Sequence, residues 1–189
     1  MKWRDWKKRC NMPDFDPVGT IEFFRERHSV EAATTALVLR ALPADALSYR
    51  PHPGSSTAGA TAWTIVRCLQ ISGNLTHSES AEVPRTPHPD HDALITDFDH
   101  CAQSLQQTLL TMSQTDWLKE RTVVSGGTVI LRQPLGQILW LFLFDGIHHR
   151  GQLTTYLRTL GAKVPSIYGP SGDTTAYSAN PERQIRSRS

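Results

Sequence analysis

Cysteine is scarce in this 189-residue sequence, which holds only Cys10, Cys68 and Cys101. The three lie far apart and no two of them form a C-x-x-C pair. An odd number of cysteines cannot close a disulfide framework, so a disulfide-stabilised scaffold is excluded. We therefore expect a protein of a reducing compartment, the cytoplasm.

Long hydrophobic runs are also absent. The longest covers residues 138–144, whereas a membrane-spanning helix needs about 20 apolar residues. The charged start, MKWRDWKKRCN, is not followed by the apolar stretch of a signal peptide. No G-x-S-x-G motif and no glycine-rich phosphate loop occur, so nucleophilic hydrolysis and nucleotide chemistry have no support. We expect a soluble protein that has no membrane partner.

A basic face is missing from the middle of the chain, although the formal net charge is +2. Residues 1–10 carry five Lys or Arg and one Asp, and residues 180–189 carry three Arg and one Glu. The residues between them therefore have a net charge of about −4, and they cannot gather phosphates over a broad surface. We expect no nucleic acid to bind through the folded domain.

The composition suits one folded domain, because 39% of the residues are hydrophobic and 20% are charged. We expect a basic N-terminal extension at residues 1–16, the domain at residues 17–175, and a flexible tail at residues 176–189.

Helical periodicity dominates that domain. Apolar residues recur at three- and four-residue spacing over about 20–42, 57–82, 90–112 and 134–161. Ser55, Ser56 or Thr57 can cap the second helix, and Asp90 or Asp92 the third. Four long helices with short or proline-rich links predict an all-α fold, a four-helix bundle.

Two further features lie around the last helix. The β-branched runs at 122–124 and 128–130 flank Gly126 and Gly127, which predicts a small β-hairpin before this helix. The first half of the helix, LGQILWLFLF, is apolar around most of its circumference. Either the other helices surround it or a second subunit covers it.

The candidate site residues follow that apolar stretch. Asp145 and His149 lie one helical turn apart on the stripe that also holds Ile138 and Phe142. A carboxylate and an imidazole at this spacing can bind one divalent cation, with a third ligand from a facing helix. The simpler interpretation, favoured by spacing alone, is that Asp145 hydrogen-bonds His149 or that Arg150 lies nearby at the surface, with no metal. His148 lies about 60° further round the helix, where packing is its expected role.

A longer motif surrounds these residues. The stretch FDGIHHRGQLTTYLRTLGAKVPSIYGPSGD, residues 144–173, resembles the C-terminal signature of the DinB-like family, the DinB/YfiT-type metalloenzymes. In that signature a helix with an HHRGQ-type motif is followed by YLR..G..VP..YG. Ala58, Gly59 and Trp63 also match the opening of the family's second helix.

The resemblance implies a four-helix bundle with a long crossover connection, commonly a homodimer. It also implies a divalent metal, typically nickel or zinc, held by one residue of the second helix and an i, i+4 pair of the last. Relatives of known activity transfer or isomerise small thiol-linked compounds with thiols such as glutathione, mycothiol or bacillithiol. The family's link to DNA damage concerns expression and says nothing of this reaction.

This sequence departs from the family pattern at two of the three ligand positions. His149 matches the second histidine of the pair, Asp145 stands where most relatives have the first, and Thr64 replaces the histidine of the second helix. Threonine is a poor ligand for zinc or nickel, and Cys68, one turn later, is a conceivable substitute.

Two functions follow from this pattern. One is a metal-dependent thiol transferase or isomerase in which Asp145 or His148 moves a proton. The alternative is a catalytically silent dimeric binding or structural module with a degenerate metal site.

Overall fold

The computed structural model describes residues 20–173. The expected basic extension at 1–16 and tail at 176–189 lie outside the described residues. Within them, no helix is long and apolar enough to cross a membrane.

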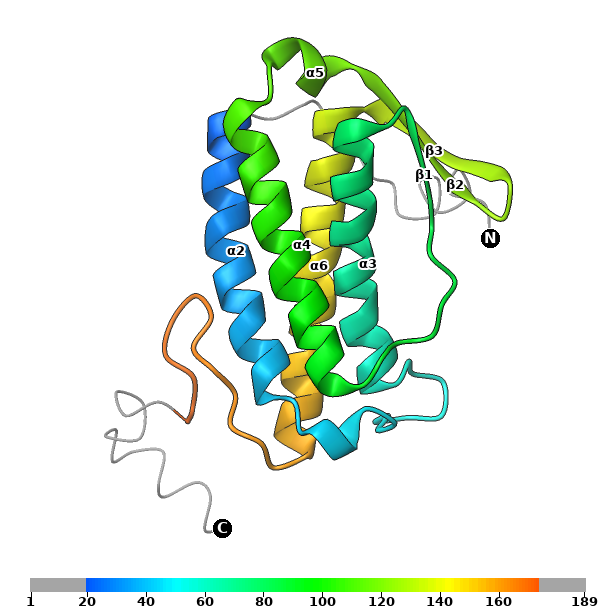
Figure 1. Ribbon diagram of the computed structural model, residues 1–189. Coiled ribbons are helices and arrows are strands. Elements are labelled where there is room, and N and C mark those ends of the chain that lie inside the picture. The colour runs from blue at the N-terminus through cyan, green and yellow to red at the C-terminus, as the bar shows by residue number, and fades with distance from the viewer. Residues whose placement is uncertain (1–19, 174–189) are drawn as a thin grey trace.

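Four long helices form the bundle, as the sequence predicts (Figure 1). They are α2 (Ile21–Ala41), α3 (Ala58–His77), α4 (His91–Thr111) and α6 (Leu135–Thr159). Thr20, Thr57 and Asp90 cap the first three, because each side chain accepts a hydrogen bond from the backbone N–H three residues later. The short helices η1 (Ala44–Ala46) and α5 (Gln114–Leu118) lie in the connections.

The connection between α3 and α4 is the long crossover that the family resemblance implies. Residues 78–90 return along the length of the bundle, so α3 and α4 run parallel while α6 runs antiparallel to α3 (Figure 1). Helix α6 packs against both α2 and α3. Its two sides therefore face different partner helices, and this arrangement positions both sites described below.

A three-stranded sheet covers one end of the bundle. The predicted hairpin is present as β2 (Glu120–Ser125) and β3 (Thr128–Pro134), and Gly126 and Gly127 adopt the positive φ values, 58° and 75°, that its tight turn requires. The strand β1 (Ser80–Glu82) was not expected: it pairs parallel with β2. The predicted helix from 57 to 82 therefore ends early, at His77.

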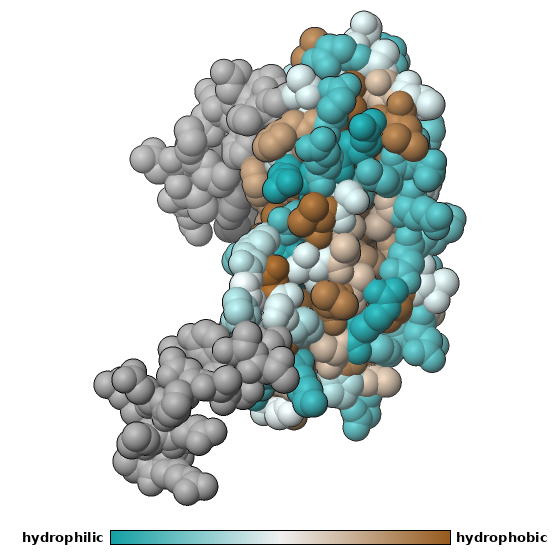
Figure 2. All heavy atoms as spheres, turned by 90° about the vertical axis from the view of Figure 1, so that its left-hand side faces the viewer, coloured by the Kyte–Doolittle hydropathy of each residue, from teal (hydrophilic) through white to brown (hydrophobic). Residues whose placement is uncertain are grey.

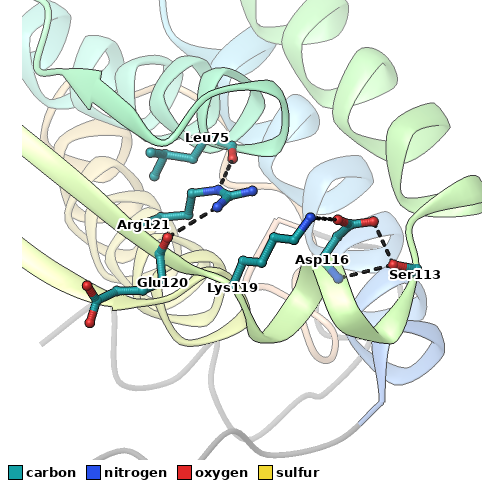
Figure 3. Close-up of polar contacts among 6 residues, drawn as sticks. All are labelled: Leu75, Ser113, Asp116, Lys119, Glu120 and Arg121. Carbon is teal, nitrogen blue, oxygen red and sulfur yellow. Dashed lines mark hydrogen bonds and ion pairs between the residues drawn. The ribbon is translucent and has the colours of Figure 1, made fainter.

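Polar contacts join this sheet to the helices (Figure 3). Arg121 Nε donates to the backbone oxygen of Leu75 in the last turn of α3, at 3.0 Å. Ser113 caps α5, and Lys119 pairs with Asp116 at 2.7 Å. Hydrogen bonds from Lys119 and Ser113 lower the pKa of Asp116 to about 2.

The core runs the length of the bundle in two clusters of buried residues, one centred on Trp63 and Leu153 and the other on Phe24 and Trp117. Trp117 of α5 lies against Gly136 of α6 so closely that a Cβ there would overlap the indole. Ile138, Leu139 and Trp140 are buried, as the all-round apolar pattern of α6 predicts, whereas Phe144 is 42% exposed.

Candidate functional site between α3 and α6

A carboxylate, an imidazole and a thiol meet where α6 faces α3. Asp145 Oδ2 lies 3.5 Å from His149 Nε2, and the Cys68 thiol donates to the same oxygen at 3.4 Å. Cys68 is buried, while the Asp145 and His149 side chains are 42% and 22% exposed. The pair therefore lies at the edge of the buried face of α6 and is open to solvent on one side.

Gln152 orients both histidines of the motif. His149 donates through Nδ1 to Gln152 Oε1 at 2.9 Å, and the amide nitrogen of Gln152 lies 3.0 Å from His148 Nε2. The first contact turns His149 Nε2 toward Asp145. His148 is exposed, with its ring edge-on to His149 at a centroid distance of 5.2 Å. Its proposed role in moving a proton stays a prediction, as does that of Asp145.

The charges of this cluster follow from its contacts. The hydrogen bond to Asp145 raises the pKa of His149 above its ordinary value. Burial by itself raises the pKa of the Asp145 carboxyl, but His149, the Cys68 thiol and His148 outweigh it and the pKa is lowered. Burial and the Asp145 charge raise the pKa of Cys68 well above its usual range. The cluster thus favours an imidazolium, a carboxylate and a protonated thiol, which is a poor nucleophile.

Thr64 does not join this cluster as a ligand. Helices α3 and α6 run antiparallel and Cys68 contacts Asp145, so Thr64, four residues before Cys68, comes about level with His149, four residues after Asp145. Its hydroxyl, however, donates to the backbone oxygen of Ala60 at 3.0 Å. It also accepts a hydrogen bond from the Arg67 guanidinium at 3.1 Å. Arg67 is held in turn by the backbone oxygen of Pro84 at 3.2 Å.

The residues present therefore do not fit the metal centre that the family resemblance implies. Asp145 and His149 are two candidate ligands, and Cys68 contacts Asp145, but burial raises the pKa of the Cys68 thiol and keeps it protonated. Thr64 is a neutral hydroxyl that is already hydrogen-bonded, and the Arg67 cation lies against it. Over residues 20–173, no group of three or more His, Cys, Asp or Glu side chains is placed to hold a metal ion. Arg67 was not among the residues expected at this site.

Arg150 lies in the core, which corrects the expectation that it lies at the surface. It is 1% exposed and forms an ion pair with Glu31 of α2 at 2.7 Å. It also donates to Thr35 and, at 2.6 Å, to the hydroxyl of Tyr168, which donates to Glu31. The Arg of the HHRGQ motif and the Tyr of the YG segment thus tie the chain after α6 to α2.

The fold and the motif define the class of protein. The four-helix bundle has a crossover between its second and third long helices and carries Asp145 and His149 on its last helix. The family model of the DinB family matches residues 16–184. The chain belongs to the DinB family.

Individual relatives agree with this assignment. The uncharacterised protein YrdA of Bacillus subtilis strain 168 is 30% identical over 154 residues, which cover 80% of this chain and 90% of YrdA. A DinB-like protein from Bacillus cereus has a similar structure, with a TM-score of 0.66 and 24% identity over 79% of this chain and 98% of that one. The mycothiol-dependent maleylpyruvate isomerase shares the fold at a TM-score of 0.54 and 15% identity, over 81% of this chain and 63% of the isomerase.

Proposed function

We propose that this DinB-family chain is a homodimeric, catalytically silent binding module whose metal site is degenerate. The observation that carries this proposal is the contact of the Arg67 guanidinium with Thr64. Thr64 stands at the position where the family resemblance implies a ligating histidine. A fixed cation stands beside the place where a metal ion would need its third ligand.

Electrostatics supports the same conclusion. A divalent ion at Asp145 would have to displace the proton of His149, whose pKa is raised by that carboxylate. It would also lie near the Arg67 cation, whose charge already lowers the pKa of His149 in part. The Asp145 carboxylate therefore already has a cationic partner, the protonated His149, when no metal is bound.

A metal-dependent thiol transferase or isomerase is the second candidate, and one observation favours it. Gln152 holds His149 through Nδ1 and leaves Nε2 facing Asp145, which is how metal-ligating histidines are commonly oriented. If a metal were held there, Asp145 and His149 would be two of its ligands and a small thiol would be the expected partner.

Metal titration separates the two functions. Protein purified without an affinity tag or chelator is exposed to Ni, Zn, Mn or Fe, dialysed, and measured for metal content and thermal unfolding. We expect substoichiometric metal and an unchanged melting temperature. A tightly bound ion at a hundredfold excess over its dissociation constant would add about 2.7 kcal/mol to the free energy of unfolding.

The matched control restores the third ligand. In the double variant Thr64→His/Arg67→Leu, the histidine lies level with His149 and the cation is gone, so we expect one equivalent of zinc or nickel to bind. If the wild-type chain already holds one equivalent, and His149→Ala abolishes it, the proposal of a degenerate site is wrong.

A further inference from the structure

A cavity lies between the four long helices, and Cys68 of the Asp145 cluster is one of the residues that line it. It has a volume of about 30 Å³ and is lined mostly by apolar side chains of all four long helices, together with the polar side chains of His28, Glu31 and Thr35 on α2 and Ser72 on α3. A groove of about 280 Å³ lies outside it, between α2 and α6, with Phe23, Trp140 and Phe144 in its walls. Glu31, Leu143 and Ile147 line both spaces and so form the neck between them.

His28 presents an unused hydrogen-bond acceptor in this cavity. The residue is 3% exposed, and its Nδ1 lies 3.2 Å from Gln106 Oε1, so Nδ1 carries the hydrogen and donates it. Gln106 does not line the cavity, and the other ring nitrogen, Nε2, is buried without a hydrogen-bond partner. Burial lowers the pKa of His28, which keeps the ring neutral and Nε2 a bare acceptor. An unpaired buried polar atom costs about 1–3 kcal/mol.

The volumes of the cavity and of the groove indicate which part of a ligand each of them can hold. A volume of about 30 Å³ holds a hydroxyl group or a water molecule but no ring. The groove is close to the lower limit of small-molecule pockets, about 300 Å³. Its walls are aromatic, with Trp140 between Phe23 and Phe144 at centroid distances of 6.0 and 5.4 Å. The indole N–H of Trp140 is also buried without a partner.

Charge and hydrogen bonding around the neck favour a neutral ligand, although the Arg27 cation lines the groove outside the cavity. Glu31 lines both spaces, and its carboxylate is already bound by Arg150 and Tyr168. A ligand carboxylate would approach this negative charge, and it has no hydrogen to donate to His28 at neutral pH. A neutral hydroxyl group satisfies both conditions.

We propose that the groove and cavity between α2 and α6 bind a small neutral phenol or alcohol, whose apolar body lies in the groove and whose hydroxyl donates to His28 Nε2. This site goes beyond the proposed function, because it assigns a ligand class to the space between α2 and α6, which shares only Cys68 with the Asp145 cluster. It stands whether or not a metal binds at Asp145 and His149.

The test compares p-cresol with toluene, which differ only in the hydroxyl group, and with p-toluate, which carries a charge. Binding to the wild-type protein is followed by shifts of backbone amide signals and of the His28 Nε2 signal in ¹⁵N NMR. We expect p-cresol to bind about tenfold more tightly than toluene, as one added hydrogen bond to a buried group predicts. It should shift the Nε2 signal, whereas p-toluate should leave that signal unchanged because its carboxylate has no hydrogen to donate.

Two isoleucine variants locate the site. Ile147→Trp fills the neck and should abolish p-cresol binding. Ile95→Trp, at a partly buried isoleucine of α4 that lines neither space, should leave it unchanged. In His28→Phe, p-cresol should bind about as weakly as toluene. Equal affinity of the wild type for p-cresol and toluene, or no binding of either, overturns the proposal.

Discussion

The Asp145 carboxylate is the acidic partner of His149, and this contact makes the free energy of unfolding depend on pH. Its raised pKa contributes stability that is fully present below pH 6.5 and is lost as the pH rises through the raised value. The lowered pKa of Asp145 contributes stability that is present above pH 3.8 and is lost as the pH falls through the lowered value. The pair therefore stabilises the protein most between pH 3.8 and 6.5. Cys68 and Arg67 face it from α3, and His148 flanks it on α6.

Replacing the carboxylate tests this pair. In Asp145→Asn we expect the NMR titration midpoint of His149 to fall toward 6.5, because the largest contribution that raises it is gone. The free energy of unfolding should fall by less than about 1 kcal/mol near pH 5, since Asp145 is 42% exposed and solvent screens the pair.

Asp92→Asn is the matched control, because it removes an exposed carboxylate of α4 that does not contact His149. A wild-type midpoint at or below 6.5, or one that Asp145→Asn leaves in place, contradicts the ion pair.

Side chains whose partners lie on the same helix were predictable from the sequence, and side chains with distant partners were not. Asp145 and His149 share one helix, so their spacing alone brings them together. Arg67 contacts Thr64, one turn earlier on α3, but also Pro84 in the crossover, and Arg150 pairs with Glu31, more than a hundred residues earlier. Helical spacing brings Arg67 near Thr64, but it predicts neither the contact of Arg67 with Pro84 nor the burial of Arg150 against Glu31.

The chain after α6 has little regular structure, so its place on the bundle depends on side chains. Tyr168 shares its hydroxyl between Arg150 and Glu31, and the Arg150 guanidinium lies 5.2 Å from the centre of its ring. Because the ion pair is buried, loss of one partner leaves an uncompensated charge. The YG segment of the family signature therefore has a structural role here, in joining this segment to α2.

Tyr168→Phe should lower the free energy of unfolding by about 1–2 kcal/mol, since one hydrogen bond to each of two charged groups is lost. Arg150→Met should cost more, about 3–5 kcal/mol, because Glu31 stays buried. Urea unfolding at pH 7 measures both. Tyr49→Phe is the control: its hydroxyl donates to the exposed Thr159 at 2.7 Å, and a loss there as large as in Tyr168→Phe would refute the role of Tyr168.

The helices and the hairpin were readable from the sequence because their signals are local. Capping side chains, helical periodicity and the Gly126-Gly127 turn each act within a few residues. The strand β1 has three residues and exists only through its pairing with β2, some forty residues later. The prediction from local periodicity therefore extended the second helix to residue 82, although residues 80–82 form the strand β1.

At the scale of the whole molecule, one apolar stripe lies on the outer face of the bundle. Phe23, Val30 and Leu37 recur at seven-residue intervals along α2, and they are 45%, 48% and 53% exposed. Figure 2, which views the α2 side, shows hydrophobic residues among hydrophilic ones on this face. Exposed apolar residues in such a row are typical of a helix that packs against another subunit. A homodimer through α2 would lie beside the groove, because Phe23 belongs to both.

We expect the homodimer to depend on the centre of that stripe. Val30→Asp places a charge where two copies of α2 would pack, and a buried unpaired carboxylate costs more than an exposed apolar contact contributes. Sedimentation at micromolar concentration should show a dimer for the wild type and a monomer for Val30→Asp, with unchanged helicity. Leu110→Asp makes the same change on α4, where Leu110 is 54% exposed outside the stripe, and it should stay dimeric. A monomeric wild type, or a dimer that Leu110→Asp dissociates and Val30→Asp does not, rules out this interface.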